Sequence, residues 1–368
     1  MTGVRQSFVF ALEKEFKGDV IGTKWIRPPP GSYLSTGHSR GATKINTEGC
    51  KTWDTVAYGQ FTGSWEWTFT LDYDYLEPFY LAFEDYDVTQ NLDGSYTHTF
   101  KKANNVIVPS FTIRRKVLNN LGMGGGQDEV VELKGCVLRN LSFSKGAGAS
   151  QTSVTMTGFY ATEKMVLGDL DTTDYTAYNG HLTEHMCMYV SDDGEEYNYV
   201  AKTDSLQVSI ENSSNPMYST CTAFAVKYYE GYTNYSFGTS CYSDDPERYK
   251  LRVYGGGSKA TKTGSTTGPM NKGLHPLKGI KLIAYDGALD EDCTLASAEA
   301  SSKTFSFTIE DCVIKSLTWA KGDGQVLQDK ISSCDCRLMT MAVKTNIGNF
   351  DMSTGTTRNQ TVVSPDPR

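Results

Sequence analysis

The sequence contains no segment built to cross or reach a membrane. No stretch approaches the roughly 20 consecutive apolar residues that a membrane-spanning helix needs. The apolar patch in the opening segment MTGVRQSFVFALEKEF is short and is followed at once by charges, and it lacks the small-residue cleavage site of a signal peptide. We therefore expect a protein that is made and assembled in a cytoplasm and has no membrane partner.

Dense runs of lysine and arginine are also missing. The formal net charge is −8 and the sequence pI is about 5.3. Duplex DNA carries one negative charge per ~1.7 Å of its axis, so a protein that holds DNA needs a basic surface. The composition therefore argues against a conventional nucleic-acid binder.

Long runs of Ala, Leu, Glu and Lys are absent, which argues against a helical bundle. The chain instead holds 35 Gly, 22 Tyr and 16 Phe among many Thr and Ser residues, a composition that favours strands and turns. A hydrophobic fraction of 39% against a charged fraction of 21% is enough for a real core. At 368 residues the chain exceeds the usual size of one domain, so two domains are expected.

Signatures of catalysis are incomplete. The segment from His181 to His185 matches the H-x-x-E-H pattern of inverted zinc proteases, but its Asp- and Thr-rich surroundings show no helical pattern to place both imidazoles on one face. The glycines of 122–126 are not followed by Gly-Lys-Ser/Thr, so they do not form a phosphate loop. The sequence also offers no G-x-S-x-G elbow and no plausible catalytic triad.

Carboxylates gather in one short segment, which holds Asp72, Asp74, Glu77, Glu84, Asp85 and Asp87. Glycosidases flank the scissile bond with two carboxylates, so a carbohydrate-active β-protein is the enzyme alternative. A solvated acidic face is the favoured interpretation. We predict no enzyme, no catalytic residue, no metal site and no cofactor.

Nine cysteines do not form an obvious disulfide framework. The number is odd, and in a reducing compartment most thiols stay free. Cys334 and Cys336 occupy alternate positions, so their thiols share one face of a strand, with Cys312 close in sequence. These three residues could form a metal site. Free thiols are the favoured interpretation, because C-x-C is not a standard zinc spacing.

An internal repeat is the most useful pattern in the chain. Residues 136–148 read CVLRNLSFSKGAG and residues 312–324 read CVIKSLTWAKGDG. The Cys, Val, Leu, Lys and two Gly are identical, and each block alternates like a strand before a Lys-Gly-x-Gly turn. The two blocks predict equivalent strands in two related domains.

Weaker matches extend the repeat. Residues 65–69 alternate like 206–210, and each run precedes a segment that could be helical, LEPFYLAFED in the first copy and TCTAFAVKYYE in the second. Each copy then ends in another alternating run, SVTMTGFYA and RLMTMAVKT. We predict a first β domain over 1–165, a connector over 166–199, a second β domain over 200–345 and a polar tail over 346–368.

Within the first domain, strands are expected at 63–71, 95–101, 108–117 and 129–143, and a flexible loop at 118–127. Residues 31–62 form a long, polar, Gly-rich stretch without a clear element. Such stretches are uncommon in compact domains and are usually either functional or disordered.

The order of these features resembles siphovirus-type tail tube proteins, the major tail proteins of tailed phages and related archaeal viruses. The resemblance rests on SFVFALEKEFKG, TKWIRP, GQFTGSWEW, YTHTF and PSFTI, in that order along residues 5–165. It implies β-sandwich or barrel-like domains, each with one short flanking helix, whose sheets join side by side in a six-domain ring. This chain is about twice the single-domain length, so three chains would supply the six domains. The second copy keeps FSFTI at 305–309 but has no match to THTF.

The resemblance also implies a role and partners. Rings would stack into a tail tube of the virion through which viral DNA passes without specific binding, with tape measure and tail terminator proteins as neighbours. The assembly residues we expect are two interface aromatics, basic and polar residues of the 31–62 stretch that would contact the adjacent ring, and the lysine that begins the Lys-Gly-x-Gly turn of each repeated block. They are Ser39, Arg40, Lys44, Lys51, Trp65, Trp67, Lys145 and Lys321.

A different class of protein also fits the composition. A receptor-binding or lectin-like β-sandwich of a virion or cell surface would present its many Tyr residues to sugars. Assembly discriminates the two hypotheses, because a tube subunit forms rings whereas a lectin stays small and binds glycans.

Overall fold

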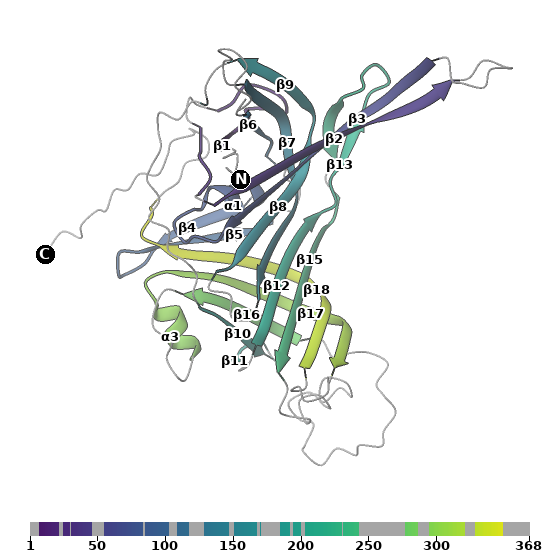
Figure 1. Cartoon of the computed structure of the whole chain (residues 1–368). Coiled ribbons are helices and arrows are strands. Elements are labelled where there is room, and N and C mark those ends of the chain that lie inside the picture. The colour runs from purple at the N-terminus through teal and green to yellow at the C-terminus, as the bar shows by residue number, and fades with distance from the viewer. Residues whose placement is uncertain are drawn as a thin grey trace, which may run out of the picture.

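The computed structural model shows a mainly β protein built around one large antiparallel sheet, drawn in Figure 1. It describes residues 7–21, 25–29, 31–45, 55–83, 85–102, 109–117, 129–146, 151–167, 170, 185–191, 194–199, 203–229, 231–242, 277–285, 294–320 and 328–348. The prediction of a mainly β fold is confirmed. No helix in these ranges is long and apolar enough to cross a bilayer.

The first half of the chain forms nine strands and one helix. They are β1 Ser7–Leu12, β2 Tyr33–Ile45, β3 Thr55–Thr70, α1 Glu77–Ala82, β4 Asp85–Gln90, β5 Tyr96–Lys101, β6 Phe111–Val117, β7 Glu129–Lys145, β8 Ser153–Tyr160 and β9 Thr162–Leu167. The long strand β7 belongs to two sheet regions. Its first part pairs with β6 and β9, and its last part pairs with β8.

The second half forms the remaining described elements. They are β10 His185–Ser191, β11 Asn198–Tyr199, β12 Thr203–Asn212, β13 Asn215–Tyr218, β14 Ala225–Tyr229, β15 Thr233–Tyr242, β16 Leu277–Tyr285, α3 Leu295–Ala300, β17 Thr304–Ala320 and β18 Gln328–Thr345. In this half β17 is the counterpart of β7. Its first part pairs with β16 and its whole length pairs with β18.

The two halves share one strand order. In the first half β1 pairs with β6, β6 with β7, β7 with β8 and β9, β8 with β3, and β3 with β2. In the second half β10 pairs with β16, β16 with β17, β17 with β18, β18 with β15, and β15 with β12. Each strand of the first series thus has a counterpart in the second, with β18 standing for both β8 and β9.

Two backbone irregularities recur at matching places. Gly135 and Asp311, each directly before the cysteine of the repeated block, both have a positive φ, of 65° and 48°. Glycine adopts this conformation without strain, and aspartate is one of the side chains that tolerate it. Four residues later, the register of each strand slips by one residue, at Arg139 in β7 and at Lys315 in β17. The strong sequence repeat therefore falls on strands that share these two irregularities. The strands differ elsewhere, because β17 has a further register shift after Ser316 against β18, and β7 has one near Gly135 against β6 that β17 lacks against β16.

The weaker sequence matches are corrected by the pairing. Residues 65–69 lie in β3, whose counterpart is β15, whereas residues 206–210 lie in β12, the counterpart of β2. The run at 337–345 lies where β9 lies in the first half, because both pair with the first part of the long strand. Alternation misled the alignment because a period of two residues is common to all half-buried strands.

Short helices are present, but not where a repeat would put both. The helix α1 falls within the predicted LEPFYLAFED, whereas the second predicted helical segment contains strand β14 instead. The helix α3 lies between β16 and β17 and begins at an N-cap, Thr294, whose hydroxyl accepts a hydrogen bond from the amide of Ser297 at 3.2 Å. The two helices therefore occupy different places in the strand order of the two halves.

One apolar core runs through both halves. Along β3 the side chains alternate, so that Trp65, Trp67 and Phe69 are buried while the residues between them face outward. In the middle of the core, the ring of Phe79 from α1 lies 6.0 Å from Phe143 of β7 and 5.6 Å from Phe305 of β17. The helix thus fills the space between the two long strands.

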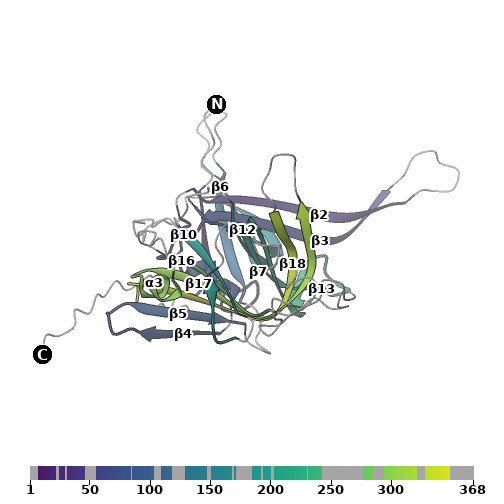
Figure 2. The ribbon, with the colours of Figure 1, turned by 90° about the horizontal axis from the view of Figure 1, so that it is seen from below.

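Two pairs of strands join the halves. The last part of β7 pairs with β12, and β5 pairs with the last part of β18, as Figure 2 shows for the β4–β5 hairpin lying alongside β17 and β18. Polar groups close this second junction. Asp74 accepts from the ammonium of Lys303 at 2.8 Å and from the hydroxyl of Thr345. The predicted acidic face is therefore wrong for Asp74, and also for Asp72 and Glu77, which are buried.

A buried histidine lies at the same junction. His98 of β5 is 0% exposed, and its Nε2 lies 2.8 Å from the carbonyl of Ile347. Because a carbonyl can only accept, Nε2 carries the proton, and Nδ1 accepts from the hydroxyl of Tyr80 at 3.0 Å. Burial lowers the pKa of His98.

The predicted boundaries need two changes. The stretch 31–62 is not without structure, because β2 and the start of β3 form a long hairpin over it. The segment 166–199 is not a plain connector, since β10 pairs with β16 and belongs to the second half's sheet. The strands expected at 95–101, 108–117 and 129–143 are confirmed as β5, β6 and β7, and the one at 63–71 is the second part of β3. The loop predicted at 118–127 and most of the polar tail lie outside the described residues.

Candidate assembly surface

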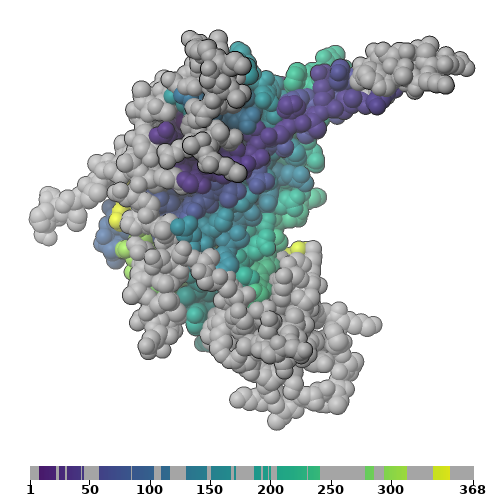
Figure 3. Space-filling model, in the orientation of Figure 1, coloured from purple at the N-terminus to yellow at the C-terminus, as the bar shows by residue number. Residues whose placement is uncertain are grey.

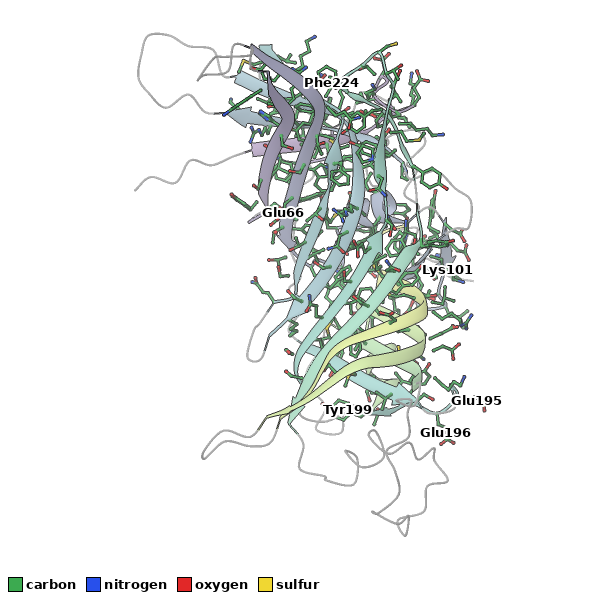
Figure 4. The ribbon with its side chains drawn as sticks, turned by 90° about the vertical axis from the view of Figure 1, so that its right-hand side faces the viewer. Glu66, Lys101, Glu195, Glu196, Tyr199 and Phe224 are labelled. Atoms are coloured by element: carbon green, nitrogen blue, oxygen red, sulfur yellow. The ribbon has the colours of Figure 1, made fainter. Side chains whose placement is uncertain are left out.

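Eight neighbouring strands form a continuous sheet with two different faces. Their order is β2, β3, β8, β7, β12, β15, β18, β17, and Figure 4 shows this sheet from its side. The face turned to the core is apolar, as in Trp65, Leu141 and Val208. The other face, called here the hydroxyl face, consists of the alternate positions.

Hydroxyl and amide side chains dominate the hydroxyl face, in rows that run straight across the strands. One row reads Tyr33, Thr68, Thr155, Ser142, Ser209, Ser236 and Asp335, and the next reads Ser35, Glu66, Thr157, Asn140, Glu211 and Asn234. Side chains bond to each other both within a row and between the two rows. The hydroxyls of Thr68 and Thr155 lie 3.3 Å apart, and Ser209 donates to the Asn140 amide oxygen at 2.8 Å.

Charge on this face is sparse and leans negative. Glu66 is exposed and, in Figure 4, points away from the body of the molecule. These two rows hold two further carboxylates. Asp335 is exposed, and Glu211 lies 3.6 Å from the guanidinium of Arg139, which also sits 5.5 Å from the ring of Phe159. A polyanion is held by clusters of cations, so a neutral to acidic hydroxyl surface can lie beside DNA without gripping it.

The eight-stranded sheet ends in two open edges. Among the described residues, β2 pairs only with β3, and residues 313–320 of β17 pair only with β18. The backbone groups of an open edge can pair with another chain, and stable proteins protect or use such edges. Most described side chains of β2 are exposed, so nothing in the described chain covers this edge.

The hairpin of β2 and β3 continues past the sheet as a projecting arm. From Arg40 to Ile45, and from Thr55 to Phe61, the two strands pair with each other, and Figures 1 and 3 show them leaving the body. Arg40 lies over the ring of Tyr58 at 5.1 Å, and the Tyr58 side chain is 66% exposed. This arm is defined as residues 41–59.

A hairpin of the second half supports the base of the arm. The hydroxyl of Tyr218 on β13 donates to the carbonyl of Phe61 at 2.9 Å, and the amide of Phe61 donates to the carbonyl of Ala223 at 2.8 Å. The ring of Phe224 packs against Phe61 at 5.4 Å. The β13–β14 hairpin connects β12 to β15, as the arm connects β2 to β3, so it is the second half's counterpart of the arm.

The structure separates the residues predicted for assembly. Ser39, Arg40 and Lys44 lie on β2, and Lys145 ends β7. Lys51 and Lys321 lie outside the described residues. The prediction for the two tryptophans is corrected, because Trp65 is 2% and Trp67 is 1% exposed. They pack against β1 and β6, at 5.4 Å from Phe8 to Trp67 and 5.3 Å from Trp65 to Phe111, and cannot contact a neighbouring chain.

The alternative metal sites gain no support. His185 begins strand β10, so it cannot share a helical face with His181, which lies outside the described residues. The sulfurs of Cys312 and Cys336 lie 3.2 Å apart as free thiols on paired strands. Nowhere in the described ranges do three His, Cys, Asp or Glu side chains cluster as metal ligands do.

Sequence reasoning missed the hydroxyl face and both open edges. The alternation of Ser and Thr with large apolar residues in β3, β7, β8 and β12 was the available signal for the face. An edge, in contrast, depends on which strands pair, and this is not visible in one strand's sequence. The sequence matches no model of a known protein family and no curated protein with significance.

Proposed function

We propose that the chain is a structural protein that self-assembles into rings, three chains to a ring, and that stacked rings form the tail tube of a virion. The observation that carries the proposal is the repeated order within the eight-stranded sheet. Strands β2, β3, β8 and β7 are followed by their counterparts β12, β15, β18 and β17 in the same order.

Such a sheet can be continued by further copies of itself. Inside one chain, β12 of the second half adds to the β7 edge of the first half. The remaining edges, β2 and β17, are the counterparts of β12 and β7, so the same junction can form between chains. An association of this head-to-tail kind closes into a ring when its rotation allows, and a closed ring has no open edges.

The number three comes from the resemblance to tail tube proteins, whose rings hold six domains. Two related halves in each chain make three chains equal to six such domains. The hydroxyl face would then line the lumen, where its few charges and many neutral groups would let DNA pass without stalling. Tape measure and tail terminator proteins would be the neighbours in a tail.

Negative-stain electron microscopy of the purified chain tests this function. We expect rings or tubes with a central hole, and end-on class averages with three-fold or near six-fold symmetry. A particle that stays small and globular at every protein concentration would contradict the proposal. A glycan-binding screen of that particle would then test the receptor-binding alternative, to which exposed tyrosines such as Tyr58 and Tyr232 would contribute.

A further inference from the structure

We propose that β2 of one chain pairs antiparallel with the last part of β17 of a second copy, with Ser39 opposite Ser316 and Gly37 opposite Thr318. The proposal rests on the proposed function, since it names the surface by which the ring would close. It adds the partner strand and the register, which a ring alone does not specify.

The register is taken from the junction inside the chain. There β12 and β7 pair with Glu211 opposite Asn140, Ser209 opposite Ser142 and Val208 opposite Phe143. The repeated block aligns Asn140 with Ser316 and Ser142 with Thr318, and the shared bulge at Arg139 and Lys315 fixes this alignment.

The alignment of β2 with β12 is fixed through the strands that follow them. Trp65 pairs with Gly158 of β8, and Phe237 pairs with Cys334 of β18. In the repeat, Cys334 is the counterpart of Gly158. Trp65 is therefore the counterpart of Phe237. Because Thr36 pairs with Trp65 and Val208 pairs with Phe237, Thr36 matches Val208.

Counting on from this match gives the rest of the register. Two positions along, His38 matches Ile210, and the next residue, Ser39, matches Glu211. The same relation holds at the end of the sheet, where Gly63 and Tyr235 pair with the matching residues Tyr160 and Cys336.

Side chains of β2 are more exposed than their counterparts on β12, as expected for a strand that has no neighbour on one side. Ile210, which pairs with Leu141 of β7 and lies in the apolar core, is 2% exposed, whereas the side chain of its counterpart His38 is 60% exposed. Val208 is 2% exposed, while Thr36 is half-buried. The β2 edge thus has the form of a junction strand whose partner is another chain.

The proposed junction between chains has fewer polar side-chain interactions than the junction inside the chain. Inside the chain, Glu211 pairs with Arg139, and Ser209 donates a hydrogen bond to Asn140. At the matching positions between chains stand Ser39 with Lys315 and Gly37 with Ser316. The junction inside the chain therefore has an ion pair, and the proposed junction between chains has none at the matching positions.

Disulfide trapping between two singly substituted full-length chains tests the register. Directly opposite residues of an antiparallel pair have Cα atoms about 4.5–5.5 Å apart, which suits a disulfide, whereas residues two positions off register are farther apart. A chain carrying Ser39→Cys is mixed with one carrying Ser316→Cys and oxidised with oxidised glutathione. We expect a covalent dimer on a non-reducing gel that disappears on reduction.

The matched control pairs Ser39→Cys with Thr318→Cys, which is out of register by two residues and should give several-fold less dimer. The unsubstituted chain measures any background from its own nine cysteines. Circular dichroism of each variant verifies that it folds. Rings in the microscope with no preference for the Ser39 and Ser316 pair would overturn the register and leave the proposed function standing. No association of the unsubstituted chain in sedimentation would overturn both.

A charge exchange at Ser39 provides a second readout. The carboxylate introduced by Ser39→Glu would copy the pair of Glu211 and Arg139 opposite Lys315, and should lower the concentration for half-assembly by about two- to fivefold at low salt. Ser39→Lys, which places like charges together, should raise that concentration. A shift of both variants in the same direction would contradict the register.

Discussion

At the scale of single residues, two glycines allow the core of the first half to close. A Cβ atom at Gly158 would lie 2.0 Å from the carbonyl oxygen of Val137 and 2.6 Å from the Trp65 ring, and one at Gly63 would meet the ring of Tyr160 at 2.4 Å. Both contacts are too short for any side chain. The aromatic rings therefore occupy the space that the missing side chains leave.

We expect Gly158→Ala to destabilise the chain by about 2–3 kcal/mol, because the added methyl group meets backbone and a buried indole that cannot move away. Urea unfolding followed by tryptophan fluorescence measures the change. Gly146→Ala is the matched control, since a Cβ there meets nothing within 4 Å. Equal stability of the two variants would show that β8 does not approach Trp65 so closely.

His98 predicts a pH dependence of stability. Because burial holds its pKa below the ordinary value of 6.5, the unfolded chain binds more protons than the folded chain once the pH falls through 6.5. Stability should therefore be unaffected by His98 above that value. It should fall below it, by at most about 1.4 kcal/mol per pH unit.

The comparison of His98→Gln with the unsubstituted chain isolates this effect. Glutamine can still donate to Ile347 and accept from Tyr80 but cannot gain a proton. We expect the loss of unfolding free energy between pH 7.5 and pH 5.5 to be smaller in the variant. An identical loss in both proteins would mean that His98 is accessible to solvent or already charged in the folded state.

At the scale of elements, the sequence predicts strands better than their partners. Alternation located β5, β6 and β7, and the identities in the repeated block matched β7 to β17 correctly. The match of β3 to β12 failed because alternation records which face is buried and not which neighbour a strand has. The segment with β14 was mistaken for a helix because a short apolar run such as AFAV fits either period.

The described strands of the arm lie outside the rest of the sheet. Its strands 41–45 and 55–59 pair with each other beyond the sheet. At its base, where the register shifts, a Cβ atom added at Gly59 would lie 3.6 Å from the Cα of Gly41. These strands were not predicted, because GATKI and TVAYG contain glycines and no regular apolar alternation.

We expect replacement of residues 42–58 by a two-residue Asn-Gly turn to leave a folded chain that still forms rings but no longer forms long tubes. The reason is that the described strands of the arm, 41–45 and 55–59, pair with each other beyond the sheet. Electron microscopy measures tube length, and thermal melting verifies folding. Tubes of normal length from this deletion would rule out a stacking role for the arm.

At the scale of the whole molecule, the described strands of the two halves follow the same order within one sheet. The halves are joined by β7 with β12 and by β5 with β18, and they share a core around Phe79. The composition already indicated a neutral to acidic surface. The hydroxyl face is such a surface. It covers one side of the eight-stranded sheet, whose β2 and β17 edges are open among the described residues.

Native mass spectrometry of the assembled chain measures how many copies a closed assembly holds. We expect a closed species of three times the 40.6 kDa chain, and heavier species at multiples of that ring. A chain that remains monomeric at all concentrations, or a ladder of masses in which three chains hold no special place, would mean that no three-chain ring forms.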